Sequence, residues 1–160
     1  MKKKGLAPII DTNTRILILG SLPSDESIRK QQYYGNPGND FWKLISEVIG
    51  KDIATLDYGA KIQKLKEHGI GLWDVLSTSE REGSLDSNIM NEEINDFSYL
   101  KNDAPNLWLV CFNGKKAGKY EDALRKHGIE TKVLPSSSGA NRRYSEKRIV
   151  EWISIAKFIA

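Results

Sequence analysis

The sequence has few residues of the kinds that bind metals or form disulfides. Among 160 residues there is one cysteine, Cys111, and there are two histidines. A single cysteine excludes an internal disulfide, a Cys-rich zinc site and a four-cysteine iron–sulfur cluster. His68 and His127 each precede a glycine where a helix is expected to end, and there they complement the helix dipole. We therefore expect no metal, no cofactor, and a reducing compartment, the cytoplasm.

The sequence also lacks a long apolar run. The basic start, residues 1–4, is followed by only a short apolar stretch before Asp11, too short for a signal peptide or a membrane span. Hydrophobic residues make up 39% and charged residues 28% of the chain, as is usual for a globular protein. The net charge of +3 permits a polyanionic partner without requiring one. We expect one domain over residues 1–160, a monomer, and no membrane partner.

Several common catalytic and nucleotide-binding motifs are missing. The stretch "LGSLPS" has no Gly-Lys-Ser/Thr, and no Gly-x-Gly-x-x-Gly occurs, so the usual mononucleotide and dinucleotide sites are disfavoured. There is no Gly-x-Ser-x-Gly, and both histidines lie at expected helix ends, so a serine hydrolase triad is disfavoured too.

Strand and helix patterns alternate along the chain. Apolar runs predict strands over 15–20, 107–112 and 129–134, and a short one over 70–76. Periodic apolar positions predict helices over 41–49, 58–69 and 113–128, a weaker one over 91–100, and a last one from about Ser145 with residues 149, 152, 153 and 156 inward. Parallel neighbouring strands need crossover helices, so this alternation predicts an α/β fold, a three-layer α/β/α sandwich with a mainly parallel central sheet.

Three polar loops follow the most certain strands, at 20–24, 112–116 and 134–143. Because ligands bind at the carboxyl ends of parallel strands, we expect these loops to share one rim. Each also has a purely structural explanation. Asn39 or Asp40 can cap the helix that begins at Phe41, and Tyr33 and Tyr34 can be surface aromatics. In the other loops, Asn113-Gly114 can be a simple turn, Lys115, Lys116 and Lys119 a solvated face, and serines 136–138 a flexible loop.

Taken together, the loops resemble the uracil-DNA glycosylase superfamily. "GSLPS" (20–24) resembles its first motif and "LPSSS" (134–138) its second. The intervening "YYGNPGNDFWKLI" (33–45) is similar to the His-Pro-x-Asn-x-Phe-Trp segment of the mismatch-specific branch and of the hypoxanthine-DNA glycosylases. With "GLWDVL" and "CFNGKKA", the resemblance covers roughly residues 14–155, and the joint spacing is more specific than any single piece.

One departure from the superfamily pattern indicates the branch. Most branches have Asn or Asp in the first motif to position the attacking water, and this chain has Leu22. In the hypoxanthine-DNA glycosylase branch, the Asn before x-Phe-Trp supplies the amide, which implies Asn39 as the catalytic residue whose oxygen orients the water. Asn36 replaces the usual His and Gly139 a common Pro, which bears on substrate range.

The resemblance also implies how DNA is bound. Tyr34, with Tyr33 nearby, would stack on an extruded base, Asn113 would recognise its pairing edge, and the backbone N–H groups of Ser21 and Leu22 would stabilise it. The predicted DNA contacts are Ser136, Ser137, Ser138, Asn141, Arg142, Arg143, Lys115 and Lys116.

The resemblance therefore implies a monofunctional DNA glycosylase that excises hypoxanthine, with uracil and xanthine as further candidate bases, from DNA containing a deaminated base. No lysine calls for a Schiff base, so the expected product is an intact abasic site. Two alternatives stay open: a non-catalytic nucleic-acid-binding module on the same fold, and a small-molecule nucleoside hydrolase.

Overall fold

The centre of the protein is a parallel four-stranded sheet. A computed structural model describes residues 2–81 and 89–159. The strands are β2 (Ile16–Gly20), β3 (Ile70–Asp74), β6 (Leu109–Asn113) and β7 (Thr131–Leu134), in the order β3-β2-β6-β7. Every pairing is parallel, and Ile18 lies opposite Leu72 on one side and Cys111 on the other. All four carboxyl ends therefore meet at one edge.

The uninterrupted apolar run of β2 is explained by burial on both faces. Ile16 and Ile18 belong to one buried cluster, and Leu17 and Leu19 to a second. All four side chains are fully buried. Alternate residues of a strand face opposite sides, so a strand covered on both sides needs apolar residues throughout.

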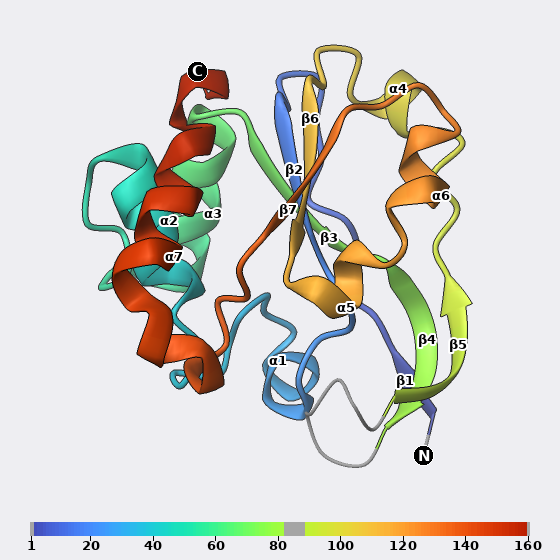
Figure 1. Ribbon diagram of the computed structural model, residues 1–160, viewed down its shortest axis with the longest axis horizontal. Helices are drawn as coiled ribbons and strands as arrows, with labels where there is room; N and C mark the ends of the chain where they lie inside the picture. The colour runs from blue at the N-terminus through green and yellow to red at the C-terminus, as the bar shows by residue number, and fades with distance from the viewer. Residues whose placement is uncertain (1, 82–88, 160) are drawn as a thin grey trace.

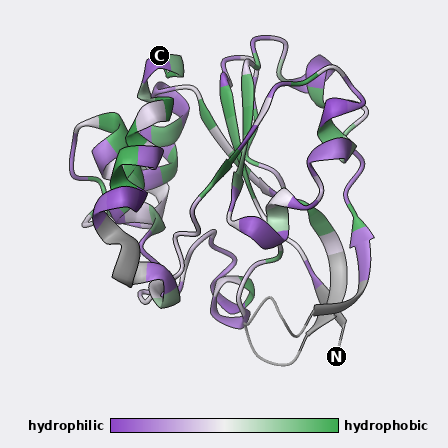
Figure 2. Cartoon of the chain, viewed as in Figure 1, coloured by the Kyte–Doolittle hydropathy of each residue, from purple (hydrophilic) through white to green (hydrophobic). Residues whose placement is uncertain are grey.

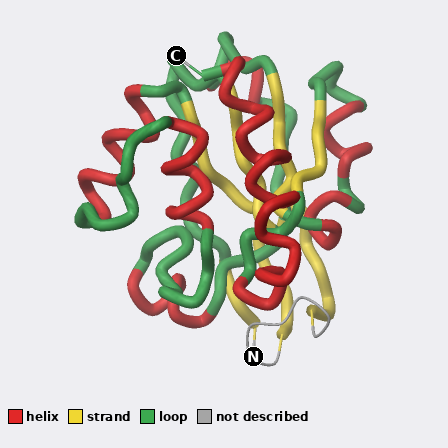
Figure 3. Tube along the Cα trace, turned by 60° about the vertical axis from the view of Figure 1, so that its left-hand side comes forward, coloured by secondary structure: helices red, strands yellow, loops and turns green. Residues whose placement is uncertain are grey.

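Helices cover both faces of the sheet (Figure 1). The first cluster is completed by α2 (Phe41–Ile49), α3 (Tyr58–Glu67) and α7 (Ser145–Ile153), with a 3₁₀ turn, η3 (Ser154–Phe158), after α7. The second is completed by α4 (Leu100–Asp103), α5 (Lys115–Gly118) and α6 (Glu121–Arg125). Apolar residues concentrate on the central strands (Figure 2). Helices lie on both sides of these strands (Figure 3). The predicted three-layer fold with a parallel sheet is confirmed.

A second, antiparallel sheet was not predicted. It has the order β1-β4-β5, from β1 (Lys2–Lys4), β4 (Leu76–Arg81) and β5 (Ile89–Ile94). The prediction of a helix over 91–100 was therefore wrong, because pairing with β4 makes the start of this segment a strand. Ile94 is 46% exposed, whereas Phe97 is buried as expected.

Two other helix predictions need correction. The helix expected over 113–128 is divided into α5 and α6, with the chain turning through Lys119 and Tyr120 between them. At the end of α5, a Cβ on Gly118 would lie 2.8 Å from a methyl carbon of Val133, so glycine lets α5 approach β7 closely. The last helix begins at Ser145 as predicted and buries Trp152 completely, but Ile153 is 41% exposed rather than inward.

The helices predicted over 41–49 and 58–69 are present as α2 and α3, and α3 ends at Glu67, two residues before the predicted end. α2 starts at Phe41 and ends at Gly50, which has φ +81° and donates its N–H to the Ser46 carbonyl. A short helix that the sequence did not predict, α1 (Asp25–Lys30), follows the loop after β2. Within the described ranges, no helix has both the length and the apolar character needed to cross a membrane.

Candidate active site

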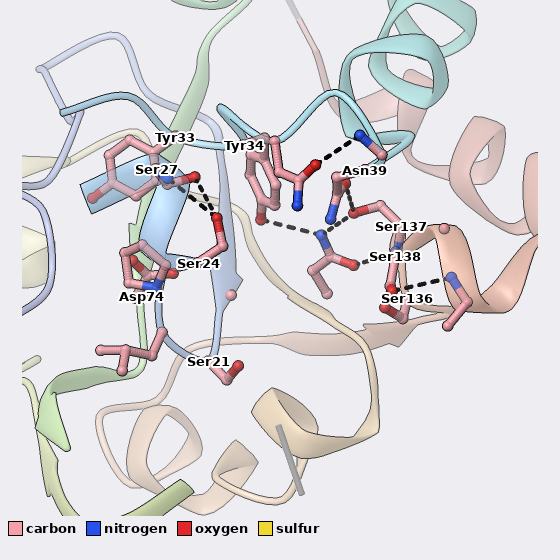
Figure 4. A pocket seen from close by; sticks show the side chains of 18 of the residues that line it. Ser21, Ser24, Ser27, Tyr33, Tyr34, Asn39, Asp74, Ser136, Ser137 and Ser138 are labelled. Carbon is pink, nitrogen blue, oxygen red and sulfur yellow. Dashed lines mark hydrogen bonds between the residues drawn. The ribbon is translucent and has the colours of Figure 1, made fainter. Parts of the chain in front are cut away.

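A cavity of about 630 Å³ lies at the carboxyl edge of the parallel sheet. It is lined by residues 20–24 after β2, by residues of the 33–39 segment, by Asp74 and Asn113 at strand ends, and by residues 136–141 after β7. Figure 4 shows side chains from these separate segments converging on it. The expectation that the loops share one rim is confirmed.

Asn39 both bonds the start of α2 and lines the cavity. Its Oδ1 accepts from the Phe41 N–H at 2.9 Å, at the start of α2, and from the Ser137 hydroxyl at 2.7 Å. Figure 4 shows the Asn39 and Ser137 side chains turned toward one another. A carbonyl oxygen has two acceptor directions, and both are used here. Orienting a water through this oxygen, as predicted, therefore requires the Ser137 hydroxyl to turn away; the Asn39 Nδ2 donates to no group among the described residues.

Asn113, the last residue of β6, is held from two sides. Its Nδ2 donates to the Ser137 hydroxyl at 2.8 Å and to the Tyr34 hydroxyl at 3.1 Å, and its Oδ1 accepts from the Ser137 N–H at 2.9 Å. Both amide hydrogens are therefore committed inside the protein, and one acceptor direction of Oδ1 remains. As it stands, the amide can accept from a ligand N–H but cannot donate to a ligand carbonyl.

Tyr34 stands in a strained backbone conformation beside these amides. Its φ is +53°, which is uncommon for a residue other than glycine and costs of order 1 kcal/mol or more. Its ring stacks on that of Phe41, with centroids 3.9 Å apart and planes 11° apart, and the Trp42 indole N–H donates to its carbonyl at 3.2 Å. Phe41 thus supports one face of the ring that was predicted to stack on a base.

Tyr33 lines the cavity, but its hydroxyl is bonded within the protein. Its side chain is buried, and its hydroxyl donates to the Ala7 carbonyl at 2.8 Å. Burial, with the charge of Asp74 adding to it, raises the pKa of the Tyr33 phenol far above its usual range. The hydroxyl therefore stays protonated and anchors the 33–39 segment to the N-terminal chain.

The loop after β2 contributes mainly shape. Leu22 is 6% exposed and belongs to the second apolar cluster, so its side chain cannot hold a water. Its N–H has no acceptor in the described part of the chain, and Leu22 and Ser21 both line the cavity, as the predicted backbone donors must. Ser24 ends the loop and caps α1 through the Ser27 N–H.

The serine loop after β7 is buried at its centre. Ser137 is 1% exposed and its hydroxyl donates to Asn39, so this hydroxyl would have to turn before it could contact a phosphate, and the predicted DNA contact stays a prediction. Ser136 and Ser138 are half-buried, with hydroxyls that accept from the N–H groups of Ser138 and Ala140. The Asn141 amide donates to the Ser136 carbonyl at 3.1 Å. Of the three serines, only Ser136 and Ser138 retain exposed surface for DNA.

A buried ion pair that was not predicted from the sequence lies behind this loop. Arg148 of α7 is 4% exposed, and its Nη2 lies 2.7 Å from Asp40 Oδ2. Its Nη1 donates to the Ser136 carbonyl at 3.2 Å and to the Ser138 carbonyl at 3.1 Å. Arg148 precedes the buried Trp152 by four residues and so shares its helix face. A charged residue on an apolar helix face was the signal that could have identified it.

Asp74 was also missed. It ends β3, is 4% exposed and lines the cavity, as Asn113 does at the end of β6. A Cβ on Gly20 would lie 2.7 Å from Asp74 Oδ1 and 3.4 Å from the Tyr34 hydroxyl oxygen, so glycine leaves room for both groups. A polar residue that closes an apolar strand at the ligand edge was again the available signal.

Of the basic residues predicted to contact DNA, Lys115 is exposed and Lys116 is paired with a carboxylate. Lys116 is paired with Glu92 of β5, and Lys119 lies 3.6 Å from the same carboxylate, whereas Lys115 is exposed at the start of α5. The side chains of Arg142 and Arg143 lie outside the part of the structure that is described. In the described ranges, no group of three or more His, Cys, Asp or Glu side chains could hold a metal ion.

A parallel sheet with a polar cavity at the carboxyl ends of its strands places this chain among the α/β proteins whose ligands bind at that edge. The family model of the uracil DNA glycosylase superfamily matches residues 7–156, and the chain belongs to this superfamily.

Two curated relatives and a solved structure are similar along nearly the whole chain. A Methanosarcina acetivorans protein named hypoxanthine DNA glycosylase is 61% identical over 155 residues, covering 97% of this chain and 98% of the relative. One from Methanosarcina barkeri with the same name is 57% identical, covering 98% and 99%. The solution NMR structure of a uracil DNA glycosylase-like protein from M. acetivorans matches with a TM-score of 0.91, 60% identity and 98% coverage of each chain. The resemblance seen in the motifs is confirmed.

Proposed function

We propose that this chain is a monofunctional DNA glycosylase that excises hypoxanthine from DNA, on one domain spanning residues 1–160. The observation that carries the proposal is the meeting of Asn39, Asn113 and Tyr34 in one cavity, where Ser137 joins the two amides. The relatives named hypoxanthine DNA glycosylase support this choice of base. Uracil and xanthine remain further candidate substrates.

The target base enters the cavity only after leaving the duplex. An extruded base stacks on the face of Tyr34 that Phe41 does not cover, because aromatic faces bind bases regardless of sequence. The remaining acceptor direction of Asn113 Oδ1 then takes a base N–H. Hypoxanthine and uracil carry such an N–H beside a carbonyl, whereas adenine has an acceptor nitrogen at the corresponding position. Asn113 therefore favours the deaminated base over the adenine or cytosine from which it forms.

Bond cleavage leaves negative charge on the departing base and positive charge on the sugar. The N–H of Leu22 is a preorganised donor for that negative charge. Asn39 holds the attacking water against the sugar carbon through Nδ2, which donates to the water oxygen, while Oδ1 keeps its bonds to the Phe41 N–H and the Ser137 hydroxyl. An amide is a weak base, but a cation-like transition state needs little more than a well-placed water. The product is an intact abasic site.

Binding to DNA uses the rim around the cavity. Ser136, Ser138, Asn141 and Lys115, with the sequence-predicted Arg142 and Arg143, contact phosphates, and the loop 136–141 fills the space that the base leaves. We propose a monomer that acts in the cytoplasm, in keeping with a single cysteine that is fully buried.

The direct test is base release from oligonucleotides that carry one deoxyinosine, deoxyuridine or deoxyxanthosine, in single and double strands. Alkali-dependent cleavage at deoxyinosine supports the proposal. DNA binding without release from any substrate would instead indicate a non-catalytic binding module. Cleavage of free nucleosides without DNA binding would indicate a small-molecule hydrolase.

A further inference from the structure

Ser137 is the residue at which the two amides of the site meet. Its hydroxyl donates to Asn39 Oδ1 at 2.7 Å and accepts from Asn113 Nδ2 at 2.8 Å, and its N–H donates to Asn113 Oδ1 at 2.9 Å. The residue is 1% exposed, so water does not compete for these bonds. The resemblance to known glycosylases and the phosphate role first expected of this serine loop do not explain such an arrangement.

The surrounding chain fixes the position of Ser137. The carbonyls on either side of it, those of Ser136 and Ser138, accept from one nitrogen of the buried Arg148 guanidinium. Its own carbonyl accepts from the Asp40 N–H at 2.8 Å, and the Asp40 carboxylate pairs with the same guanidinium. The loop is therefore held through its backbone on both sides of Ser137, and the hydroxyl is left to contact the two amides.

The bonds at Ser137 also have a defined direction. The Ser137 N–H can only donate, so it requires the oxygen of Asn113 and turns the Nδ2 of that amide toward the hydroxyl. A hydroxyl that accepts from Nδ2 has one hydrogen of its own to give, and it gives this hydrogen to Asn39. The orientation of the Asn113 amide thus directs the Ser137 hydrogen to Asn39 Oδ1, where it acts together with the Phe41 N–H.

We infer that Ser137 is a positioning residue that couples the base-recognising amide of Asn113 to the catalytic amide of Asn39; this inference rests on the proposed function. A base that binds Asn113 correctly keeps the chain of bonds intact and the Asn39 amide in its working orientation. A base that forces the Asn113 amide to turn disturbs Asn39 as well. Ser137 therefore contributes to selectivity without contacting the base.

The test is a double-mutant cycle on the single-turnover rate of hypoxanthine release at saturating enzyme. Ser137→Ala is expected to slow release by about tenfold to a hundredfold, since it removes one buried hydrogen-bond partner from each amide. In an Asn39→Ala background the same change is expected to slow release less than about threefold, because the group that it positions is gone. Equal effects in both backgrounds, or a single variant within about threefold of wild type, would overturn the inference.

Ser46→Ala is the matched control. Ser46 of α2 also makes two part-buried hydrogen bonds, to the Trp42 carbonyl and from the Ile53 N–H, but it bonds neither amide and does not line the cavity, so its loss is expected to leave the saturated rate within about threefold of wild type. A Ser137→Ala variant that loses affinity for DNA but keeps the saturated rate would return Ser137 to a DNA-binding role. If the alanine variant does not fold, Ser137→Cys, which keeps a similar volume but has only a weak donor, takes its place.

A second measurement needs no activity. The side-chain amide resonances of Asn39 and Asn113 in a ¹⁵N-labelled sample are expected to shift together in Ser137→Ala, and those of Asn36 and Asn141 to stay. Unmoved Asn39 and Asn113 resonances would overturn the inference even if the enzyme is active. If wild type releases no base, the proposed function fails, and these resonances still decide whether Ser137 couples the amides.

Discussion

The loops after β2 and β7 line the same cavity but are held in different ways. The loop after β2 is anchored by the apolar side chain of Leu22 and by the Gly20 and Ser21 carbonyls, which accept from backbone N–H groups of residues 75 and 76. The loop after β7 is tied by polar side chains, through Ser137 to the amides and through Arg148 to its carbonyls. One loop gives the cavity its shape, and the other fixes its polar groups.

This difference explains how a site can work without a polar side chain in the first motif. The resemblance places Asn or Asp of other branches where this chain has Leu22. Here the start of α2 brings Asn39 into the cavity, and the loop after β7 holds it there. Under the proposed function, the polar group that positions the water lies on the segment before α2, and the loop after β7 supports it.

The largest expected effect concerns Arg148, which bonds the backbone of the loop after β7. Arg148→Ala removes the buried cation from the Asp40 carboxylate, which keeps the exposed Lys43 at 4.0 Å, and takes the Arg148 donor from two carbonyls, so we expect a loss of about 3 to 5 kcal/mol of unfolding free energy. Arg125→Ala is the control, because its pair with Glu121 is exposed and worth at most about 1 kcal/mol. Urea unfolding measures both. Similar losses of unfolding free energy in the two variants would show that the Arg148 contacts to the loop after β7 stabilise the protein no more than an exposed ion pair does.

The second effect concerns the loop after β2. Gly20→Ala puts a Cβ 2.7 Å from Asp74 Oδ1, so the floor of the cavity must shift, at an expected cost of about 1 to 3 kcal/mol. We also expect base release to slow by about tenfold, since a shift of the Tyr34 hydroxyl or Asp74 misplaces the base. Gly59→Ala in α3 meets only an ordinary contact and is expected to be neutral or to stabilise by up to about 1 kcal/mol. A Gly20→Ala variant as stable and active as wild type would show that this loop does not shape the cavity.

The smallest effect concerns the loop after β6, between the other two in the sheet. Lys115→Ala is expected to reduce the slope of log Kd against log salt by about 1, as for one lost phosphate contact. Lys116→Ala is expected to change it less, because Glu92 already compensates that charge. Fluorescence anisotropy with labelled duplex over a range of salt concentrations measures both slopes. Equal changes of the slope in the two variants would mean that the Lys116–Glu92 ion pair breaks when DNA binds.

The sequence was sufficient where one local pattern determined the structure. The buried strand ending at Gly20 and the helix from Phe41 to Gly50 were predicted because burial on both faces, helical periodicity and a left-handed glycine are local signals. β5 was missed because its partner β4 determines its conformation, and a pairing between distant segments leaves no local periodicity.

The site was predicted in part for the same reason. Asn39, Asn113 and Tyr34 lie in motifs, and the structure brings them together in one cavity. The inward turn of Ser137 and the pairing of Arg148 with Asp40, 108 residues apart, depend on how the loop after β7 meets α2 and α7. Such contacts follow from tertiary packing and have no spacing signature in the sequence.

The most direct measurement is the single-turnover rate of hypoxanthine release by wild type, Asn39→Ala and Asn39→Asp. Asp can keep the oxygen that accepts the Phe41 N–H, so this variant separates capping of α2 from loss of the amide nitrogen. We predict release by wild type, a rate at least about a hundredfold lower for Asn39→Ala and at least about tenfold lower for Asn39→Asp, with both variants folded. Folded variants that both release hypoxanthine within about threefold of wild type would contradict a catalytic role for Asn39 and leave it only the capping of α2.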